Sequence, residues 1–245
     1  MAEDRGIWGT WYDLPEEEEA EYLSWLHGEH IPATLERPGF LWAAHYRLEK
    51  GASLSAARSV KTFIDEPGLG KGGEFILVFG AKSAHDFLDP SPDDLLQSYD
   101  SRSREMIDLR QGERTAYFTE VGRVDGPEIA KRGPGLTPAP NVQFGAYRAK
   151  DPAYDNDFAL WYCNDRLAAL RDMKGCVGAR KLISLGGWAR HGILYEFTSL
   201  EGHEHFFETL ESQAMDTSTS IGEVVRAVDH GPGSPSKARR IWPEV

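Results

Sequence analysis

The stretches "WLHGEHIPATLERPG", residues 25–39, and "WYCNDRLAALRDMKG", residues 161–175, follow one pattern at an offset of 136 residues. Both begin with Trp and end with Gly, and an acidic residue, an aliphatic residue and an Ala recur at matching positions between them. The same offset places "WGTW" at 8–11 on "FGAY" at 144–147. This shared order and spacing predicts an internal duplication.

The first half of the chain predicts the element order β-α-β-β-α-β. Asp13 and Pro15 supply helix-start chemistry after an aromatic strand, and the "RPG" at 37–39 ends that helix. The expected elements are a strand at 6–13, a helix to about 36, strands at 40–48 and 74–80, a helical stretch at 95–109 and a strand at 114–121.

The second half repeats this order. Its expected elements are a strand at 142–149, a helix at about 153–173, strands at 176–185 and 191–198, a helix at about 200–214 and a strand at 238–245. Residues 125–141 are rich in Pro and Gly and predict a linker between an N-terminal repeat, 1–124, and a C-terminal repeat, 142–245. Each unit is typical of a ferredoxin-like split βαβ arrangement, whose helices cover one sheet face only. The fold class is therefore α+β, with two ferredoxin-like (βαββαβ) repeats forming an α/β barrel, with an aromatic-lined space between the sheets, within one chain.

Composition excludes several classes of function. The 245 residues carry a net charge of -12, which disfavours binding to a nucleic-acid backbone. The sequence contains no apolar run of membrane-spanning length and no secretory signal, and Cys163 and Cys176 do not form a disulfide framework. A cytoplasmic protein without a membrane or nucleic-acid partner is expected, and a homodimer is left open.

The first copy of the repeated helix carries unusual chemistry. Pro32 lacks an N–H and its ring clashes with the carbonyl of Gly28, so the helix should loosen between these residues, with His30 at the loosened turn. In the second copy Cys163 replaces His27 and Arg166 replaces His30, and no residue requires a break. Because a helix-breaking proline is costly, the first copy is expected to carry the catalytic residues. The second copy is expected to complete the wall of the space between the sheets.

The strands beside this helix supply further candidates. Trp8, Thr10 and Tyr12 alternate onto one face of their strand. On the next strand His45 and Arg47 share one face, while Trp42, Ala44 and Tyr46 share the other. Alternation does not tell which face lines the cavity, and large aromatic side chains suit its wall. We therefore expect Trp8, Tyr12, Trp42 and Tyr46 to line it.

With these residues in place, the chain resembles the dimeric α/β-barrel superfamily and, within it, the EthD-like branch. Trp25, His30 and Pro32 in "WLHGEHIP", together with "RPGFLWAAHY", carry the resemblance. It implies a barrel built within one chain of two repeats and a small hydrophobic ligand. Relatives include cofactor-free monooxygenases, polyketide cyclases, dehydratases, lyases and haem-binding enzymes, so the fold alone does not specify a reaction.

The favoured function is a cofactor-independent enzyme acting on a small hydrophobic substrate, aromatic or polyketide-like, by lyase, dehydratase, cyclase or cofactor-free monooxygenase chemistry. His30 would shuttle a proton, and Tyr12 or His45 would hold a substrate oxygen. The side chains expected to contact substrate are Trp8, His27, Trp42, Tyr46 and Arg166.

Other interpretations of these residues stay open. His30 and His27 also suit a structural role in the core, and Arg166 suits a surface position. One alternative function is a non-catalytic small-molecule-binding protein. Another is a haem enzyme with His30, His191 or His230 as axial ligand. No metal site is predicted, although His27 and His30 lie at i,i+3, and His203 and His205 are expected to form a surface pair.

Overall fold

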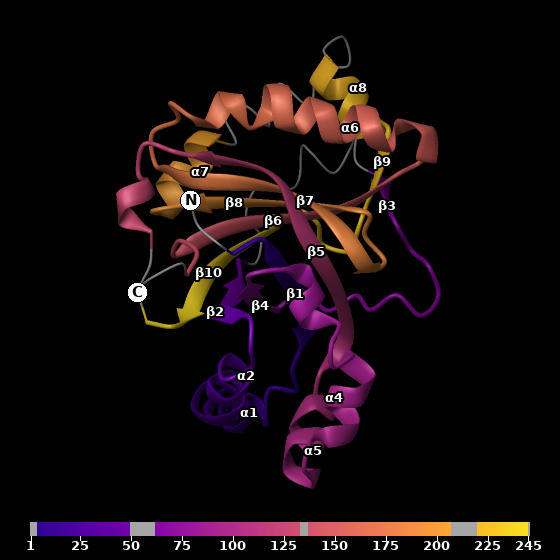
Figure 1. The fold of residues 1–245 in the computed structure, drawn as a ribbon, viewed down its shortest axis with the longest axis vertical. Coiled ribbons are helices and arrows are strands. Elements are labelled where there is room, and N and C mark those ends of the chain that lie inside the picture. The colour runs from indigo at the N-terminus through magenta and orange to yellow at the C-terminus, as the bar shows by residue number, and fades with distance from the viewer. Residues whose placement is uncertain (1–3, 50–61, 133–136, 207–219, 245) are drawn as a thin grey trace.

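Eight long strands form a closed antiparallel barrel (Figure 1). The computed structural model describes residues 4–49, 62–132, 137–206 and 220–244. The strands are β1 (Gly6–Asp13), β2 (Phe40–Leu48), β4 (Phe75–Ala81), β5 (Gln111–Asp125), β6 (Asn141–Ala149), β7 (Cys176–Gly187), β8 (His191–Phe197) and β10 (Ser236–Trp242). They follow the order β2-β4-β1-β5-β7-β8-β6-β10, and β10 closes the ring by pairing with β2. The predicted fold class is confirmed.

Each half of the barrel has the ferredoxin-like strand order, in which the second strand is followed by the third, the first and the fourth. This gives β2-β4-β1-β5 in the first half and β7-β8-β6-β10 in the second. The halves join at two seams, β5 with β7 and β10 with β2. Every sheet edge of the ring is thereby paired, which removes the exposed edges that an isolated half would present.

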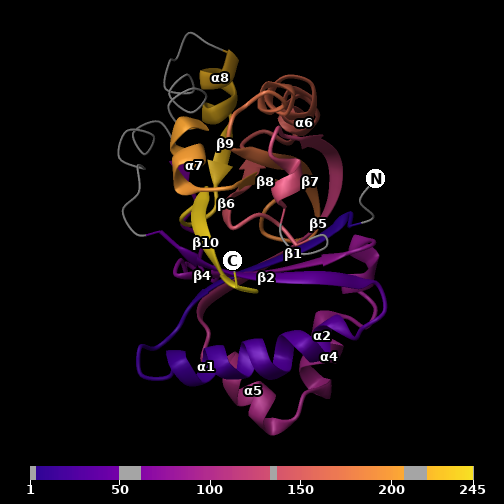
Figure 2. The ribbon, with the colours of Figure 1, turned by 90° about the vertical axis from the view of Figure 1, so that its left-hand side faces the viewer.

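The helices lie outside the barrel in two groups (Figures 1 and 2). They are α1 (Glu19–Trp25), α2 (Ile31–Leu35), α4 (Pro92–Ser98) and α5 (Ser101–Asp108) on the first half, and α6 (Asp155–Trp161), α7 (Leu200–Phe206) and α8 (Ser220–Arg226) on the second. In Figure 2 the α1–α2 helix runs across the outer face of the first half-sheet. Each sheet therefore has an inner face toward the barrel and an outer face toward helices.

The two helices of the repeated pattern end alike. Gly39 and Gly175, 136 residues apart, have φ angles of 88° and 84°, in the left-handed region that suits glycine. The chain then enters β2 and β7 respectively. The predicted helix stop at "RPG" is confirmed.

Some elements differ from the sequence predictions. β5 is longer than the expected strand at 114–121, because β7 pairs with it as far as Asp125. Two short strands, β3 (Thr62–Phe63) and β9 (Val228–His230), and the helix α8 were not predicted. The short strands pair with each other, and β9 also pairs with β6. The expected helix at 200–214 starts as α7, and its residues from 207 onward lie outside the described residues.

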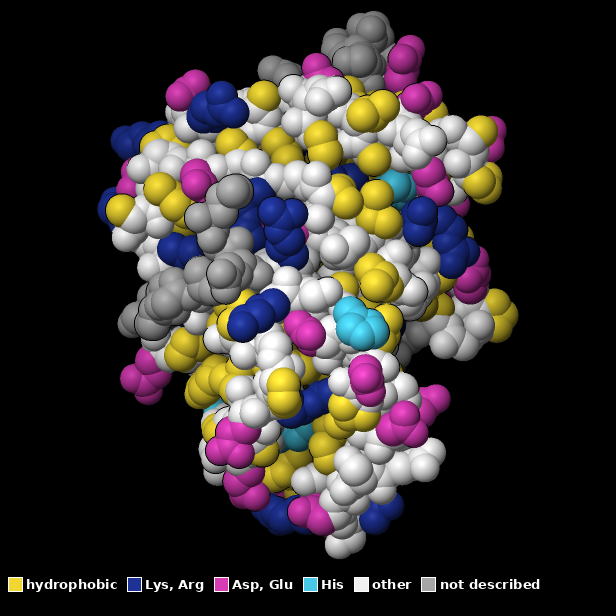
Figure 3. All heavy atoms as spheres, in the orientation of Figure 1, with side chains coloured by type: hydrophobic (Ala, Val, Ile, Leu, Met, Phe, Trp, Pro, Cys, Tyr) yellow, Lys and Arg dark blue, Asp and Glu magenta, His cyan; other side chains and the backbone are white. Residues whose placement is uncertain are grey.

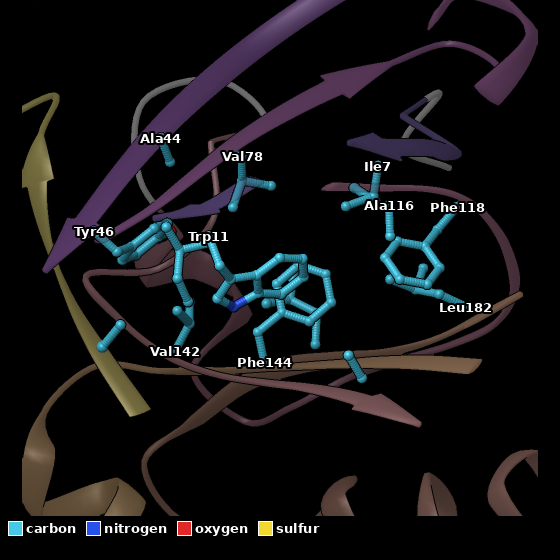
Figure 4. Packing of buried hydrophobic residues seen from close by; sticks show 14 of the residues in the cluster. Ile7, Trp11, Ala44, Tyr46, Val78, Ala116, Phe118, Val142, Phe144 and Leu182 are labelled. Atoms are coloured by element: carbon cyan, nitrogen blue, oxygen red, sulfur yellow. The ribbon is translucent and has the colours of Figure 1, made fainter. Parts of the chain in front are cut away.

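The barrel interior is a packed core. Trp11 and Phe144, from opposite half-sheets, approach to 4.9 Å between ring centroids and point toward each other in Figure 4. Phe118 packs on Phe144 at 5.8 Å. The aromatic side chains expected between the sheets thus fill the space there by contact across the barrel.

A cluster of buried charges joins this interior core. Asp4 and Glu196, both fully buried, flank the fully buried Arg180, whose nitrogens lie 2.8 Å from Asp4 and 3.4 Å from Glu196. Arg123 also binds Asp4 at 2.9 Å, and Arg132 binds Glu196. The cluster ties β7 and β8 to the segment before β1, so it spans both halves.

Candidate functional site

The two faces of the first half-sheet have different neighbours. On β1, Trp8 and Tyr12 pack with the helices outside the barrel, whereas Trp11 packs inside it. On β2, His45 hydrogen-bonds Tyr12 on the outer face, while Trp42 and Tyr46 belong to the interior core. The predicted alternation is confirmed. The expectation that Trp8, Tyr12, Trp42 and Tyr46 line one wall is wrong, since the sheet separates the first two from the last two.

Trp42 and Tyr46 are bound within the barrel core. The Trp42 Nε1–H donates to Asp4 Oδ2 at 2.9 Å, and the Tyr46 hydroxyl donates to the carbonyl of Ala139 at 3.2 Å. Both side chains are almost fully buried. Their polar atoms form hydrogen bonds within the core, so Trp42 and Tyr46 do not belong to the candidate site.

Tyr12, His45 and His27 form a continuous hydrogen-bonded chain. The Tyr12 hydroxyl lies 2.8 Å from His45 Nε2, and His45 Nδ1 lies 2.9 Å from His27 Nε2. Tyr12 and His45 are fully buried, whereas His27 is half-buried in the helix above them. This relay connects the sheet to the protein surface through three titratable groups.

Burial fixes the ordinary charge state of the relay. It raises the pKa of Tyr12 well above its usual range, with Tyr22 adding to the effect. It lowers the pKa of His45 well below 6.5, with His27 and Arg110 adding to the effect, and it also lowers the pKa of His27. Near neutral pH the relay therefore holds one phenol and two neutral imidazoles. The hydrogen bonds of such a chain can all point from Tyr12 toward His27 or all point from His27 toward Tyr12. Moving each proton across its hydrogen bond converts one arrangement into the other.

Arg110, which sequence analysis missed, supplies positive charge at the inner end of the relay. Its guanidinium lies 4.9 Å from the centre of the Tyr12 ring, and its Nε–H donates to the Tyr22 hydroxyl at 2.7 Å. Glu113 binds it at 2.9 Å. Its position just before β5 gives no sequence signal, because only the pairing of β5 with β1, which sets Gln111 opposite Asp13, brings it to Tyr12.

His30 stands apart from the relay. Its ring lies between those of Trp25 and Tyr99, at centroid distances of 4.7 and 5.4 Å. Burial lowers its pKa to about 3, with contributions from Arg110 and Arg37. The hydrogen-bonded pair of His45 and His27 suits proton transfer better than His30, because each of the two can pass a proton directly to its neighbour.

The predicted loosening of the first helix is confirmed as a π-helical turn at Leu26–His30, just before Pro32. The Ile31 N–H bonds the carbonyl of Leu26, five residues back. The expectation of an unbroken second helix is wrong. Tyr162–Arg166 forms a second π turn, in which the Leu167 N–H bonds the carbonyl of Tyr162 at 2.9 Å. The second helix has no proline near this turn, so a proline is not required for it. We attribute the π turn in both helices to the way they pack on the sheet.

Aromatic side chains form a second part of the site. Trp8 packs on Tyr117 at 5.2 Å and on Phe87 at 5.9 Å, and its Nε1–H donates to Thr115 at 2.8 Å. Burial raises the pKa of Tyr117 to about 12, and nearby Tyr99 adds to this shift. Figure 3 shows a hollow between the α1–α2 helix and helices α4 and α5, with hydrophobic, histidine and basic side chains inside it. Such a hollow suits a small hydrophobic molecule.

Two predicted positions in the second half differ from expectation. Arg166 is buried, and its Nε–H donates to the Tyr195 hydroxyl at 3.3 Å, so it is neither on the surface nor near the relay. His203 is also buried and bonds Gln143 at 2.6 Å, whereas His205 is exposed. The expected surface pair is therefore wrong, because α7 packs His203 against β6.

The candidate haem ligands fit that role unequally. Both ring nitrogens of His191 are hydrogen-bonded, to Lys181 and Asp155, and the buried His230 ring packs against Tyr147 at 4.9 Å. His191 therefore suits an axial ligand least, because both of its ring nitrogens are already bonded. Among the described residues, no group of three or more His, Cys, Asp or Glu side chains could hold a metal ion.

The neutral histidines predict a pH-dependent stability. Unfolded His45 takes up a proton near pH 6.5, but folded His45 stays neutral, so the free energy of unfolding should fall below pH 6.5 by about 1.4 kcal/mol per pH unit. His30 adds a similar slope until its folded pKa of about 3. Urea unfolding at several pH values measures this slope. An NMR signal of the His45 ring that titrates near pH 6.5 in the folded protein would contradict it.

Comparison with known proteins identifies the fold. No protein-family model and no curated protein sequence matches the chain. Among solved structures, an anthrone oxidase-like protein is similar with a TM-score of 0.65 and 10% identity, covering 98% of this chain and 92% of that one. A putative monooxygenase from Fusobacterium nucleatum has a TM-score of 0.57 and 8% identity, covering 97% and 93%. A dye-decolorizing peroxidase from Bacteroides thetaiotaomicron has a TM-score of 0.55 and 9% identity, covering 98% and 94%.

These similarities show that the chain has the ferredoxin-like α/β-barrel fold. At such low identity they show the fold alone. The EthD-like branch and the internal duplication stay predictions. No helix in the described part of the chain is both long and apolar enough to span a membrane.

Proposed function

We propose that this protein is a cofactor-independent enzyme that removes a proton from a small aromatic or polyketide-like substrate. The observation that carries the proposal is the unbroken relay from fully buried Tyr12 through His45 to half-buried His27. A buried phenol bonded to a histidine pair can accept a substrate proton while its own proton moves outward. The sheet face that holds the relay also carries Trp8 among aromatic rings.

Each part of the site has a role in this proposal. The rings of Trp8, Tyr99 and Tyr117 hold the carbon skeleton. Arg110 stabilises the negative charge that develops on a substrate oxygen when the proton leaves, since a charge placed in advance in a buried site acts strongly. Tyr12 receives the proton and passes its own to His45, and His27 delivers one to solvent.

Among the reaction types open to such a base, we favour cofactor-free oxygenation. A deprotonated tricyclic aromatic ketone is electron-rich enough to react with O2. One anthrone and one O2 then give one anthraquinone and one water. The similar fold of the anthrone oxidase-like protein supports anthrone as the first substrate to try.

The test is anthrone oxidation in air, followed by quinone absorbance and O2 uptake. We expect turnover above the uncatalysed rate, reduced about 100-fold or more in Tyr12→Phe, because the phenylalanine keeps the ring and removes the hydroxyl. Tyr154→Phe, in the other half of the barrel, should retain the rate.

Other outcomes separate the alternatives. Quenching of tryptophan fluorescence by anthrone without turnover would favour a non-catalytic binding protein. A Soret band in the purified protein that His30→Ala removes would favour a haem enzyme. Anthrone oxidation that is unchanged in Tyr12→Phe would contradict the relay.

A further inference from the structure

The second half of the barrel contains another chain of buried titratable groups. His191 on β8 lies with its Nε2 2.8 Å from Asp155 Oδ1 of α6 and its Nδ1 2.9 Å from Lys181 Nζ of β7. Lys181 and His191 are almost fully buried, whereas the Asp155 side chain is 26% exposed. None of these residues contributes to the relay of the first half.

The position of Lys181 matches that of His45. The offset of 136 residues that aligns the halves places Lys181 on His45 and Cys163 on His27. Both Lys181 and His45 lie on the second strand of their half-sheet, beside a helix with a π turn. Cys163 lies near enough to Lys181 to influence its pKa, as His27 does that of His45. The fold thus places a titratable group at the same point under each helix.

The donors and acceptors along Asp155, His191 and Lys181 define the protonation state of each group. The Asp155 carboxylate accepts from His191 Nε2–H, so Nδ1 of the neutral imidazole carries a lone pair and accepts from Lys181. Lys181 Nζ also donates to the carbonyl of Leu182 at 2.9 Å. Among the described residues no carboxylate forms an ion pair with Lys181. A buried ammonium here would lack a direct counter-charge, which favours the neutral amine.

The surroundings agree with a neutral amine. Burial lowers the pKa of Lys181 to about 7; Arg190 lowers it further, while Cys163 and Asp155 act in the opposite direction. Burial also lowers the pKa of His191 to about 4, with Lys181 adding to the effect and Asp155 opposing it. The rings of Phe158 and Tyr162 lie 5.3 and 5.7 Å from Nζ.

We propose that Asp155, His191 and Lys181 form a second reaction centre, in which the Lys181 amine condenses with a small aldehyde or ketone to form a Schiff base. The nitrogen lone pair attacks the carbonyl carbon, a C–N bond forms and the C=O double bond becomes a C–O single bond. His191 Nδ1 takes one proton from the nitrogen and passes it to the oxygen, which gives a carbinolamine. His191 then transfers the second nitrogen proton to the hydroxyl, the C–O bond breaks, and water leaves as the C=N bond forms, so one amine and one carbonyl give one imine and one water.

Asp155 has a positioning role in this centre. Its carboxylate holds the proton on His191 Nε2, which turns the Nδ1 lone pair toward the amine, and it stabilises the imidazolium that forms when Nδ1 takes the proton. A chain of acid, histidine and nucleophile uses the same logic as other activated nucleophiles. The centre shares no residue with the Tyr12 relay, so its test is independent of the proposed function.

The test is reductive trapping on the full-length protein. Acetaldehyde and sodium cyanoborohydride at pH 7 convert a Schiff base to a stable ethyl-lysine, which peptide mass spectrometry locates. We expect Lys181 to be labelled at least about 10-fold faster than exposed Lys174, because an ordinary lysine is neutral in only about 1 of 2,500 molecules at pH 7. The labelling rate should rise with a midpoint near pH 7.

Variants separate the chemistry from mere exposure. Lys181→Met should abolish labelling at this position, and Lys174→Met should leave Lys181 labelling unchanged. His191→Asn keeps an acceptor near the amine but cannot take its proton, so we expect labelling to slow about 10-fold with the pH midpoint retained. Labelling of Lys181 no faster than of Lys174 in the wild-type protein, or with a midpoint near pH 10, would overturn the proposal even if every variant failed to fold.

Discussion

Replacing His45 with glutamine is expected to slow anthrone oxidation by about 10²–10⁴-fold, the range typical of a lost acid–base group. Glutamine can still accept a hydrogen bond from the Tyr12 hydroxyl, but its amide cannot take up a proton and pass another to His27. The relay would then be cut at its fully buried middle member. Steady-state rates of quinone formation, with wild-type and variant protein at several pH values, measure the effect.

A stability measurement distinguishes this effect from damage to the fold. The His45→Gln variant loses its bond to His27, worth about 1 kcal/mol, and should unfold at a similar urea concentration. Its free energy of unfolding should also depend less steeply on pH below 6.5, because one histidine that titrates on unfolding has been removed. Full activity of a folded His45→Gln protein would exclude the relay from the reaction.

Replacing Arg180 with methionine should lower the free energy of unfolding by about 3–5 kcal/mol, the cost of breaking a buried ion pair by removing one partner. Arg180 lies between Asp4 and Glu196, and all three side chains are fully buried. Methionine fills most of the volume but leaves the two carboxylates with fewer donors. Urea unfolding at pH 7 measures the loss, and Arg171→Met, at an exposed position, should change it by less than about 0.5 kcal/mol.

The same cluster predicts an acid limit to stability. Burial alone would raise the pKa of both Asp4 and Glu196, but Arg180 and the neighbouring arginines lower each below its usual range. Their stabilisation is therefore present above pH 4.5 and lost as pH falls through the folded pKa values. Arg180→Met should weaken this acid dependence. A variant as stable as the wild type at pH 7 would show that the cluster contributes little.

More of the fold than of the candidate site could be predicted from the sequence. Strands β1 and β2 have the predicted bounds, because aromatic and β-branched residues alternate there and turn residues flank them. The Gly39 helix stop follows from the local chemistry of glycine. The loosened turn at Leu26–His30 precedes Pro32 as predicted, but the second helix has the same turn without a proline. No proline or glycine lies within or just after the turn at Tyr162–Arg166, so the sequence contains no local signal for it.

The candidate site depended on facts that alternation alone does not carry. Residue type alone marks Tyr12 and His45 as candidates, and it does not predict the hydrogen bond between them. Trp42 and Tyr46 also suit a cavity wall by residue type, but they lie on the opposite face of the sheet. Arg110 and Lys181 were missed, since an isolated basic residue at a strand gives no signal until its neighbours are known.

The sequence by itself therefore predicted the order of the long strands, the similar order of elements in the two halves and which residues share a face of each strand. These depend on local backbone preference and on periodicity, which neighbouring residues decide. Only the tertiary structure decided which face meets the helices, because that depends on how the two half-sheets close on each other through β5–β7 and β10–β2. Packing of the helices on the outer faces buried Tyr12, His45 and Lys181 away from water, and burial is what sets the charge state of each.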